Sequence, residues 1–383
     1  MQTEAMYFGP ARTTEDFEAA RLLAASILEV HTPADEALDY KRFLWSDPLL
    51  PGLDHVIIAA APSGEIHGVV RLVPRSLRHA TEVIKIAGIS SVCVAESQRN
   101  RGLARHLMNA ALIQAEALGY ELAVLFARRA VDHLYPRFDI WGLASYSKLT
   151  IATFPSTEGQ PGVLFRELQE SDLPLAAGWH KDAYGECFGW LERSIEQWRF
   201  LLQWARRRRL SLSIAEIGGT PAGYVVANGR RVTEIGFAAP ALGLAMVREL
   251  SPGADPLLID MPPRHKLRSQ LSGADFTVSS RRCEYGGHMV GVLNRTKACA
   301  RLAARVSQRA LALGLPPCQE RIDGLMLNWD GRQGTVHIDS EATRQPLGLN
   351  TTARLVGAVL AGTGESSLLA PAEPLNFLSL DEF

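Results

Sequence analysis

The sequence predicts an α+β protein with mixed sheets, arranged as three modules along 383 residues. A short β-branched strand, a polar basic turn and an amphipathic helix follow one another from Ile89 to Leu118. The order hairpin, strand, helix occurs in the first part of the chain and again after residue 194. A helix, a hairpin and a second helix follow after residue 287. The length agrees with two or three domains of roughly 150 residues each.

The composition is that of an ordinary globular protein with a large core. Hydrophobic residues make up 47% of the chain, charged residues 21%, and the net charge is -1. This balance gives no support for binding to nucleic acid or to an anionic membrane. No uncharged apolar run approaches the ~20 residues of a membrane span, and the N-terminus lacks the pattern of a signal peptide. We therefore expect a cytoplasmic protein with neither kind of partner.

The cysteines argue for reduced thiols. They are odd in number, scattered, and form no CxxC pair. This pattern disfavours a disulfide framework and a zinc site, so no metal is expected. The five are Cys93, Cys187, Cys283, Cys299 and Cys318.

The first module begins with a helix for which Thr14 is the expected N-cap. A helical stretch is expected at 40–45 and ends at the Asp47-Pro48 break. Three strands, a helix, a strand, a short helix and a final strand follow. Their expected ranges are 55–61, 66–74, 83–94, 103–119, 122–126, 131–135 and 145–151. A linker of turn-forming residues at 154–162 closes this module.

The second and third modules are also expected to combine helices and strands. In the second, helices are expected to open at 166–174 and to run over 194–204 and 240–250, with strands at 211–216, 223–228 and 232–237. Its counterpart of the basic turn reads Ala238-Ala239-Pro240, which offers nothing to hold a pyrophosphate. The third module should contain helices at 293–313 and 351–360 and a hairpin of 323–329 with 335–338. The expected domain bounds are 1–154, 155–286 and 287–383.

The turn from Glu96 to Gly102 carries the clearest functional signal. Arg99 and Arg101 make it basic, Gly102 lets a ligand approach the backbone, and the small Ala104 follows in the first helical turn. A turn of this kind aims several N–H groups and a helix N-terminus at one point, which suits a pyrophosphate. The alternative is an ordinary strand-to-helix turn with solvated arginines.

This motif resembles the acyl-CoA signature of the GCN5-related N-acetyltransferases (GNAT). The resemblance is carried by Val92-x-Val94 and Arg99-x-x-Gly102-x-Ala104, with Glu96 where such proteins often have Pro. It implies that acetyl-CoA is the acyl donor. The implied cofactor-binding residues are Val92, Cys93, Val94, Arg99, Asn100, Arg101, Gly102, Leu103 and Ala104.

The whole chain resembles the enhanced intracellular survival (Eis) acetyltransferases. That resemblance implies two tandem acetyltransferase domains, the second degenerate, a C-terminal domain similar to sterol carrier proteins, and homo-oligomers that are hexamers. The stretch Tyr135-Pro136-Arg137-Phe138 implies that Tyr135 protonates the CoA thiolate, although the family usually has Gly where this chain has Pro136. The family's general base is the free carboxylate of the last residue, here Phe383. Such a base agrees with the absence of a carboxylate from 84 to 94.

The amine acceptor stays open at this point. An aminoglycoside, a polyamine or a lysine-like amine would suit a direct transfer, as would one dedicated protein or metabolite amine. A non-catalytic acyl-CoA-binding regulator is a further alternative, in which the third domain binds a lipid or a protein. Tyr135 could also simply pack against the sheet. Cys93 could be proposed as an acyl-carrying nucleophile, but it lies in mid-strand with no evident His partner, so core packing explains it better.

Overall fold

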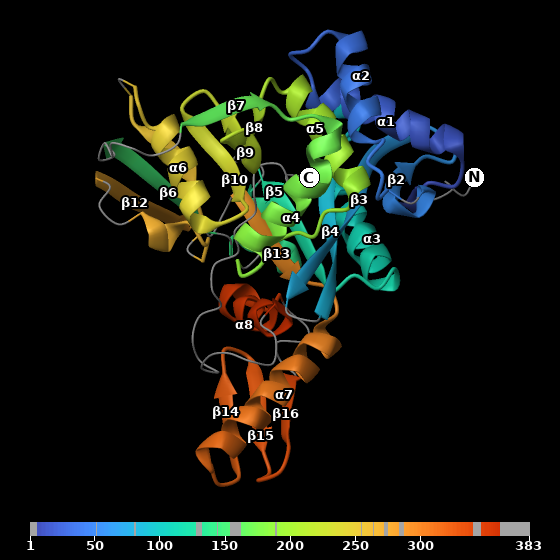
Figure 1. The fold of residues 1–383 in the computed structure, drawn as a ribbon. Coiled ribbons are helices and arrows are strands. Elements are labelled where there is room, and N and C mark those ends of the chain that lie inside the picture. The colour runs from blue at the N-terminus through green and yellow to red at the C-terminus, as the bar shows by residue number, and fades with distance from the viewer. Residues whose placement is uncertain are drawn as a thin grey trace, which may run out of the picture. The chain divides into compact units, whose positions relative to one another are not determined.

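A computed structural model describes residues 6–50, 52–79, 82–127, 132–143, 145–153, 162–187, 190–253, 255–262, 264–271, 275–282, 287–339 and 346–360. The chain divides into two compact units. Unit 1 contains the described residues up to Leu143 and those from 287 to 360, and unit 2 contains those from 145 to 282. Figure 1 labels most of the helices and strands of both units.

Unit 1 contains a mixed sheet of six strands in the order β1-β2-β3-β4-β5-β13. Only β4 and β5 are parallel, and the other neighbouring strands are antiparallel. A separate sheet of three strands, β14-β15-β16, packs against α7 (Figure 1). The elements are β1 (Tyr7–Pro10), α1 (Thr14–Leu28), α2 (Ala34–Leu44), β2 (Val56–Ala60), β3 (Ile66–His79), β4 (Glu82–Val94), α3 (Leu103–Ala117), β5 (Leu122–Ala127), β13 (Gly287–Val292), α7 (Arg295–Leu313), β14 (Cys318–Ile322), β15 (Leu325–Trp329), β16 (Gly334–Ile338) and α8 (Gly348–Leu360).

Helices cover both faces of the six-stranded sheet, because its strands are apolar on both sides. Ile57 and Val70 share one core cluster with Leu107 of α3. Ile58 and Val69 share the opposite cluster with residues of α1 such as Ala24. Side chains at successive strand positions point to opposite faces, so this alternation places α1 and α3 on different sides of the sheet.

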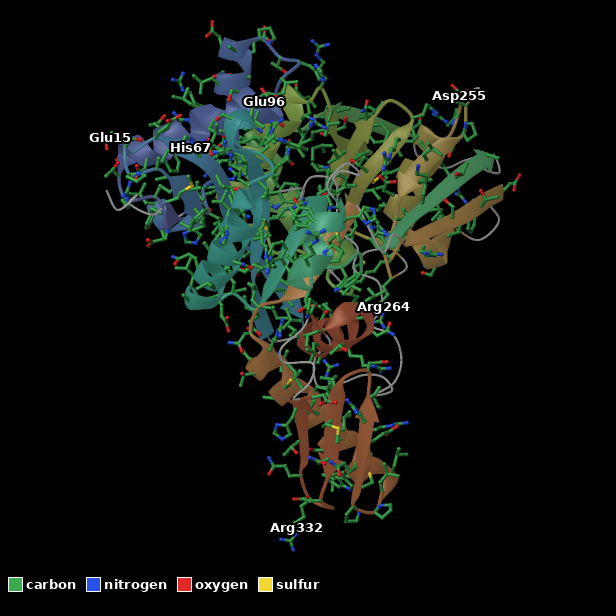
Figure 2. The ribbon with its side chains drawn as sticks, turned by 180° about the vertical axis from the view of Figure 1, so that it is seen from behind. Glu15, His67, Glu96, Asp255, Arg264 and Arg332 are labelled. Atoms are coloured by element: carbon green, nitrogen blue, oxygen red, sulfur yellow. The ribbon has the colours of Figure 1, made fainter. Side chains whose placement is uncertain are left out.

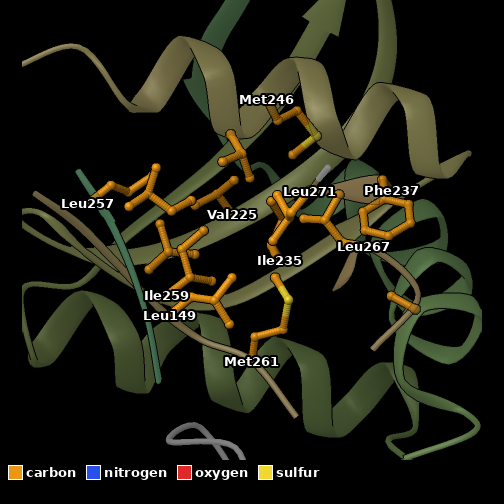
Figure 3. Packing of buried hydrophobic residues seen from close by; sticks show 14 of the residues in the cluster. Leu149, Val225, Ile235, Phe237, Met246, Leu257, Ile259, Met261, Leu267 and Leu271 are labelled. Atoms are coloured by element: carbon orange, nitrogen blue, oxygen red, sulfur yellow. The ribbon is translucent and has the colours of Figure 1, made fainter. Parts of the chain in front are cut away.

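Unit 2 contains a mixed sheet of seven strands in the order β12-β6-β11-β10-β9-β8-β7, with β10 and β11 parallel. Figure 3 shows Met246 of α6 lying over the sheet residues Val225 and Ile235 in its core. The elements are β6 (Ser145–Thr153), β7 (Val163–Glu167), α4 (Leu173–Tyr184), α5 (Ile195–Arg207), β8 (Ser211–Ile217), β9 (Thr220–Asn228), β10 (Arg231–Phe237), α6 (Pro240–Leu250), β11 (Leu257–Asp260) and β12 (Asp275–Arg282).

The structure corrects the expected place of one strand in the first sheet. The strand expected at 145–151 does form, as β6, but it lies between β12 and β11 in unit 2. The strand that pairs with the far edge of β5 is instead β13. The sequence pattern predicts that an apolar strand forms, but it does not predict the neighbouring strand. The neighbour depends on which sheet edge offers a matching register, and the residues of the strand itself carry no signal for that choice.

Three smaller predictions also need correction. Thr13, not Thr14, is the N-cap of α1, and its hydroxyl accepts a hydrogen bond from the Asp16 amide at 3.1 Å. The segment expected to open a helix at 166–174 begins with the strand β7, and α4 starts only at Leu173. The sequence analysis also missed several strands, which are β1, β7, β11, β12, β13 and β14.

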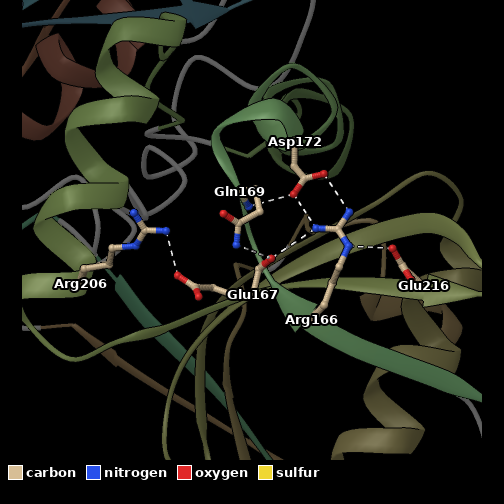
Figure 4. A network of polar contacts seen from close by, with 6 residues as sticks. All are labelled: Arg166, Glu167, Gln169, Asp172, Arg206 and Glu216. Atoms are coloured by element: carbon tan, nitrogen blue, oxygen red, sulfur yellow. Dashed lines mark hydrogen bonds and ion pairs between the residues drawn. The ribbon is translucent and has the colours of Figure 1, made fainter.

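The basic run 206–209 at the end of α5 takes part in surface contacts. Arg206 pairs with Glu167 at 2.8 Å, and the Arg208 guanidinium lies over the Trp204 ring, 5.3 Å from its centroid. Figure 4 shows the Arg206 pair beside a second network in which Arg166 bonds Asp172. The side chains of Arg206 and Arg208 are thus engaged by other residues of unit 2. Among the described residues, no helix is long and apolar enough to cross a membrane.

Candidate active site

A β-bulge interrupts β4 close to its end. Val69 of β3 faces Cys93, whereas Arg71 faces Ser90, so one intervening residue on β3 is opposed by two on β4. Ser91, one of these two, has a φ of 53°, in the left-handed region. A bulge bends its strand and increases the local twist, which turns the end of β4 away from a regular ladder.

β4 and β5 separate beyond this point. Their parallel ladder pairs Ile86–Gly88 with Leu122–Val124 and goes no further among the described residues. β5 nevertheless continues to Ala127 and stays paired with β13 over its whole length. The edge of β4 that faces β5 therefore carries backbone N–H and C=O groups that no described strand pairs with. An extended amide-containing ligand could bond there as an added strand would.

The turn after β4 presents the N-terminus of α3. Asn100 and Gly102 have φ values of 61° and 81°. Gly102 is the N-cap of α3, no side chain caps the helix, and a Cβ built on Gly102 would meet no atom within 4 Å. The first amides of α3, at Leu103 and Ala104, are therefore available to an anion, and the helix dipole favours negative charge at this end.

The two arginines of the turn are exposed and weakly engaged. Arg99 Nη1 lies 3.3 Å from Glu96 Oε1, and Arg101 Nη1 donates to Gln98 Oε1 at 3.2 Å. Figure 2 labels Glu96 at this place on the ribbon. An exposed pair of this kind contributes at most about 1 kcal/mol, so a phosphate group could displace Glu96 from Arg99. The carboxylate is thus compatible with an anion site here.

Cys93 contributes backbone to this edge, while its side chain belongs to the core. It lies 6% exposed in the cluster that contains Val69 and residues of α1. Burial raises the pKa of the Cys93 thiol to about 12. The thiolate that a nucleophile requires is therefore scarce at neutral pH, which agrees with the expectation of core packing.

Tyr135 lies on a short 3-10 helix (Asp132–Phe138) that follows β5. It is 6% exposed, and it belongs to the same apolar cluster as Leu103, with Val92 and Val94 packed against that cluster. Burial raises the pKa of its phenol above the ordinary value. Its hydroxyl forms no hydrogen bond with any other described residue. The phenol is thus protonated at neutral pH and able to donate its proton.

The other expected catalytic residue, Phe383, lies outside the described residues. Val92 and Val94, at the bulged end of β4, pack against the cluster that contains Leu103 of α3, and Arg99 and Arg101 lie in the turn between them. Sequence reasoning missed the bulge itself, for which the polar pair Ser90-Ser91 inside an apolar strand was the available signal. Within the described residues, no group of three or more His, Cys, Asp or Glu side chains could hold a metal.

Unit 2 has a similar bulge in β10 and a similar separation of β10 from β11, but side chains of unit 2 bond the exposed backbone of β10. β10 has one extra residue opposite β9, at Thr233, and it pairs with β11 only at Arg231 and Val232. Further along β10, the Ile235 N–H donates to the Tyr184 hydroxyl at 3.0 Å, and His265 Nε2 donates to the Ile235 carbonyl at 3.1 Å. The backbone groups of Ile235 are therefore already satisfied.

His265 holds its place beside Ile235 as a neutral ring. Its Nδ1 accepts from the Leu267 amide at 3.3 Å while Nε2 donates. Burial lowers the pKa of His265 to about 4. The edge of β10 thus offers no room for an extended ligand, in contrast to the edge of β4.

The end of β4 and the start of α3 lie within a segment that matches a known protein family. Residues 10–144 match the family described as the acetyltransferase (GNAT) domain. They form a GNAT acetyltransferase domain. The chain is accordingly an acyltransferase. The match ends before β13, so the strand that completes the far edge of β5 comes from outside the matched residues.

Solved structures share the fold of the acetyltransferase domain and of most of the chain. A GCN5-related N-acetyltransferase from Anabaena variabilis is 15% identical, with a TM-score of 0.61 over 99% of this chain and 100% of that one. A probable N-acyltransferase from Enterococcus faecalis is 13% identical, with a TM-score of 0.62 over 88% and 86%. Eis1 from Mycobacterium abscessus is 14% identical, with a TM-score of 0.55 over 87% and 85%. Comparison with curated protein sequences found no match.

Proposed function

We propose that this chain transfers an acetyl group from acetyl-CoA to a primary amine by direct attack. The observation that carries the proposal is the unpaired edge of β4 beside the uncapped N-terminus of α3. Together they can hold a donor that has an amide-containing arm and a pyrophosphate. The acetyltransferase domain match agrees with this donor.

The proposed roles follow from the chemistry of the residues. The amides of Leu103 and Ala104, with Arg99 and Arg101, would bind the pyrophosphate, and Asn100 and Gly102 would shape the turn around it. The backbone of Val92, Cys93 and Val94 would bond the pantetheine arm and polarise the thioester carbonyl. Holding both reactants in line would supply much of the rate.

The proton transfers complete the proposed step. The amine nitrogen attacks the acetyl carbon, the C–S bond breaks, and the electron pair leaves on the CoA sulfur. Tyr135 donates its phenolic proton to that sulfur. The amine proton goes to the carboxylate of Phe383, directly or through water. With an ordinary pKa of about 3.5, that carboxylate needs desolvation or a water relay to act as a base.

The Eis-like subtype is part of the same proposal. Its support is the fold similarity to Eis1 and the Tyr135-Pro136-Arg137-Phe138 stretch. It includes a degenerate second acetyltransferase domain, for which the occupied Ile235 backbone is support. It further includes a sterol-carrier-like third domain and a hexamer. Light scattering coupled to size-exclusion chromatography measures the assembly directly.

Deletion of Phe383 tests the proposed base. With spermidine, kanamycin and a lysine peptide as acceptors, we expect deletion to lower the rate of CoA thiol release about 10²-fold, because a positioned base contributes at least that much. The matched control is Phe383→Ala, which keeps an α-carboxylate at the same position and should retain most of the rate. Unchanged release after deletion would remove Phe383 from the mechanism, and no release by the intact chain despite tight acetyl-CoA binding would favour the regulator.

Substitution of Gly102 tests the donor site. Gly102→Ala places a Cβ on a residue with φ 81° beside the α3 amides, and we expect the acetyl-CoA Kd measured by calorimetry to rise about tenfold. Gly119→Ala is the control, because Gly119 lies just past the other end of the same helix with φ 82°. Both variants suffer the same backbone strain, so equal losses of affinity would contradict the proposed site.

A further inference from the structure

The turn that follows Tyr135 is held by its own backbone. The Asp139 amide donates to the Pro136 carbonyl at 3.2 Å, and the Ile140 amide donates to the Tyr135 carbonyl at 3.3 Å. Asp139 has a φ of 57°, a conformation that Asp tolerates better than most residues. The main chain of Tyr135 is therefore tied directly to residues 139 and 140.

The Asp139 side chain contacts residues that lie 156 and 209 positions later in the sequence. One carboxylate oxygen lies 2.7 Å from Arg295 Nη2, at the start of α7, and the other accepts from the Gly348 amide at 3.2 Å, at the start of α8. The side chain of Asp139 is 5% exposed and that of Arg295 is 37% exposed. Burial raises the pKa of the Asp139 carboxyl, and the Gly348 amide and Arg295 oppose that rise. The carboxylate thus depends on both helices for its charge.

β13 packs against the same turn. Trp141 and Val290 exchange backbone hydrogen bonds of 3.0 and 2.8 Å. A Cβ at Gly291 would lie 2.8 Å from the Asp139 carbonyl oxygen, so the turn rests on β13 where only glycine fits. β13 leads through Asn294, the N-cap of α7, into Arg295. One continuous segment therefore contacts the turn through backbone and side chain.

We propose that Asp139 is a positioning residue for Tyr135, so that the placement of the catalytic phenol depends on the contacts that the Asp139 carboxylate makes with Arg295 and with the Gly348 amide. The inference rests on the proposed role of Tyr135 as the general acid. The C-terminal part of unit 1 would then have a function in the transfer step, because α7 and α8 each supply one partner to the Asp139 carboxylate.

The chain supplies a matched control in a second buried carboxylate that also binds α7. Glu121 lies 2.5 Å from Lys297 Nζ and 3.3 Å from Arg301 Nη2, and its side chain is 6% exposed. Glu121 precedes β5, whereas the Tyr135 turn follows β5. Glu121→Gln therefore weakens the attachment of α7 without altering the contacts of the turn. A comparison with Asp139→Asn separates positioning from general stability.

The test is a double-mutant cycle between Asp139→Asn and Tyr135→Phe, with thiol release from acetyl-CoA as the readout and spermidine, kanamycin and a lysine peptide as acceptors. Asn tolerates φ 57° and keeps an oxygen for the Gly348 amide, so the folded turn should survive. Arg295→Met gives a second variant on the more exposed side of the contact. Acetyl-CoA affinity and thermal unfolding are measured for each variant.

We expect Asp139→Asn and Arg295→Met to lower kcat about tenfold with the acetyl-CoA Kd unchanged, and to have no effect in the Tyr135→Phe background. Glu121→Gln should change kcat less than twofold in either background. If Tyr135→Phe lowers kcat but Asp139→Asn does not, or lowers it equally in both backgrounds, the inference is overturned while the proposed acid stands.

A second readout does not depend on turnover. With 3-fluorotyrosine incorporated in place of Tyr135, Asp139→Asn should shift or broaden the ¹⁹F resonance, and Glu121→Gln should leave it in place. If Tyr135→Phe leaves kcat unchanged, or no acceptor gives release, the proposed acid role fails and the fluorine resonance alone decides on positioning. An unmoved resonance in Asp139→Asn would overturn the inference.

Discussion

Tyr135→Phe is expected to lower kcat by about 10²-fold while leaving the acetyl-CoA Kd within twofold of the unchanged protein. A positioned general acid contributes 10²- to 10⁴-fold, and the phenyl ring preserves the packing of this buried side chain. Thiol release at saturating acetyl-CoA gives kcat, and calorimetry gives the Kd. The control is Tyr120→Phe, which removes a buried hydroxyl that bonds His55 Nε2 at 2.8 Å. That variant should lose stability and keep its kcat.

The pH dependence provides a second check on Tyr135. The protonated phenol is the active form, so kcat falls as pH rises through its pKa. Burial raises that pKa above the ordinary value near 10, so kcat should stay level up to about pH 10 and decline only above it. This alkaline decline should be absent from Tyr135→Phe. A decline centred well below pH 10 in the unchanged protein would assign the titration to another group.

Glu234→Gln is expected to destabilise unit 2 by about 3–5 kcal/mol, the usual effect of removing one charge from a buried ion pair. Glu234 is 0% exposed, and its two carboxylate oxygens accept from the Arg193 guanidinium at 2.8 and 2.9 Å. The Tyr224 hydroxyl donates to the same carboxylate at 2.6 Å. Urea unfolding followed by tryptophan fluorescence measures the change.

The matched control for Glu234 is Glu167→Gln on the surface of the same unit. Glu167 pairs with Arg206 at 2.8 Å (Figure 4), but its side chain is 64% exposed, so the expected loss is below about 1 kcal/mol. Equal effects of the two substitutions would contradict the argument from burial. A double replacement, Glu234→Leu with Arg193→Met, should recover much of the stability because it removes both buried charges.

Acidification should weaken the Glu234 pair in a defined direction. Burial alone would raise the pKa of Glu234, but Arg193 and His180 together outweigh burial and hold the pKa below its ordinary value. A carboxyl with a depressed folded-state pKa stabilises the fold above its unfolded pKa of about 4.3. That contribution is lost as the pH falls from there toward the folded pKa, and Glu234→Gln should remove this part of the acid sensitivity.

Much of the donor site could be read from the sequence because its signals are local. The apolar strand, the turn with Arg99 and Gly102, and the helix from Leu103 all form at the expected positions. Tyr135 does lie on a short helix after β5. Each of these depends on neighbours within a few residues, so periodicity and turn chemistry suffice to predict them.

The remaining features depend on contacts between distant segments. Nothing near Asp139 indicates that Arg295 and Gly348 will hold it, and the sequence analysis did not single it out. The bulge at Ser91 is defined only against the register of β3. Likewise, the alanine-rich turn before α6 suggested that unit 2 lacks a phosphate site, but not that Tyr184 and His265 bond the backbone of Ile235.

The sequence by itself determined the fold class, the order of the main elements and the turn that suits a pyrophosphate, because these follow from local propensity and spacing. Tertiary structure alone decided that β6 joins the sheet of unit 2 and that β13 completes the sheet beside β5. Tertiary structure alone also decided that the edge of β4 beyond Gly88 has no paired strand among the described residues, whereas side chains bond the backbone of β10 at Ile235. The physical reason is that strand pairing and buried ion pairs are chosen by register and shape across the folded chain, where no short-range pattern records the partner.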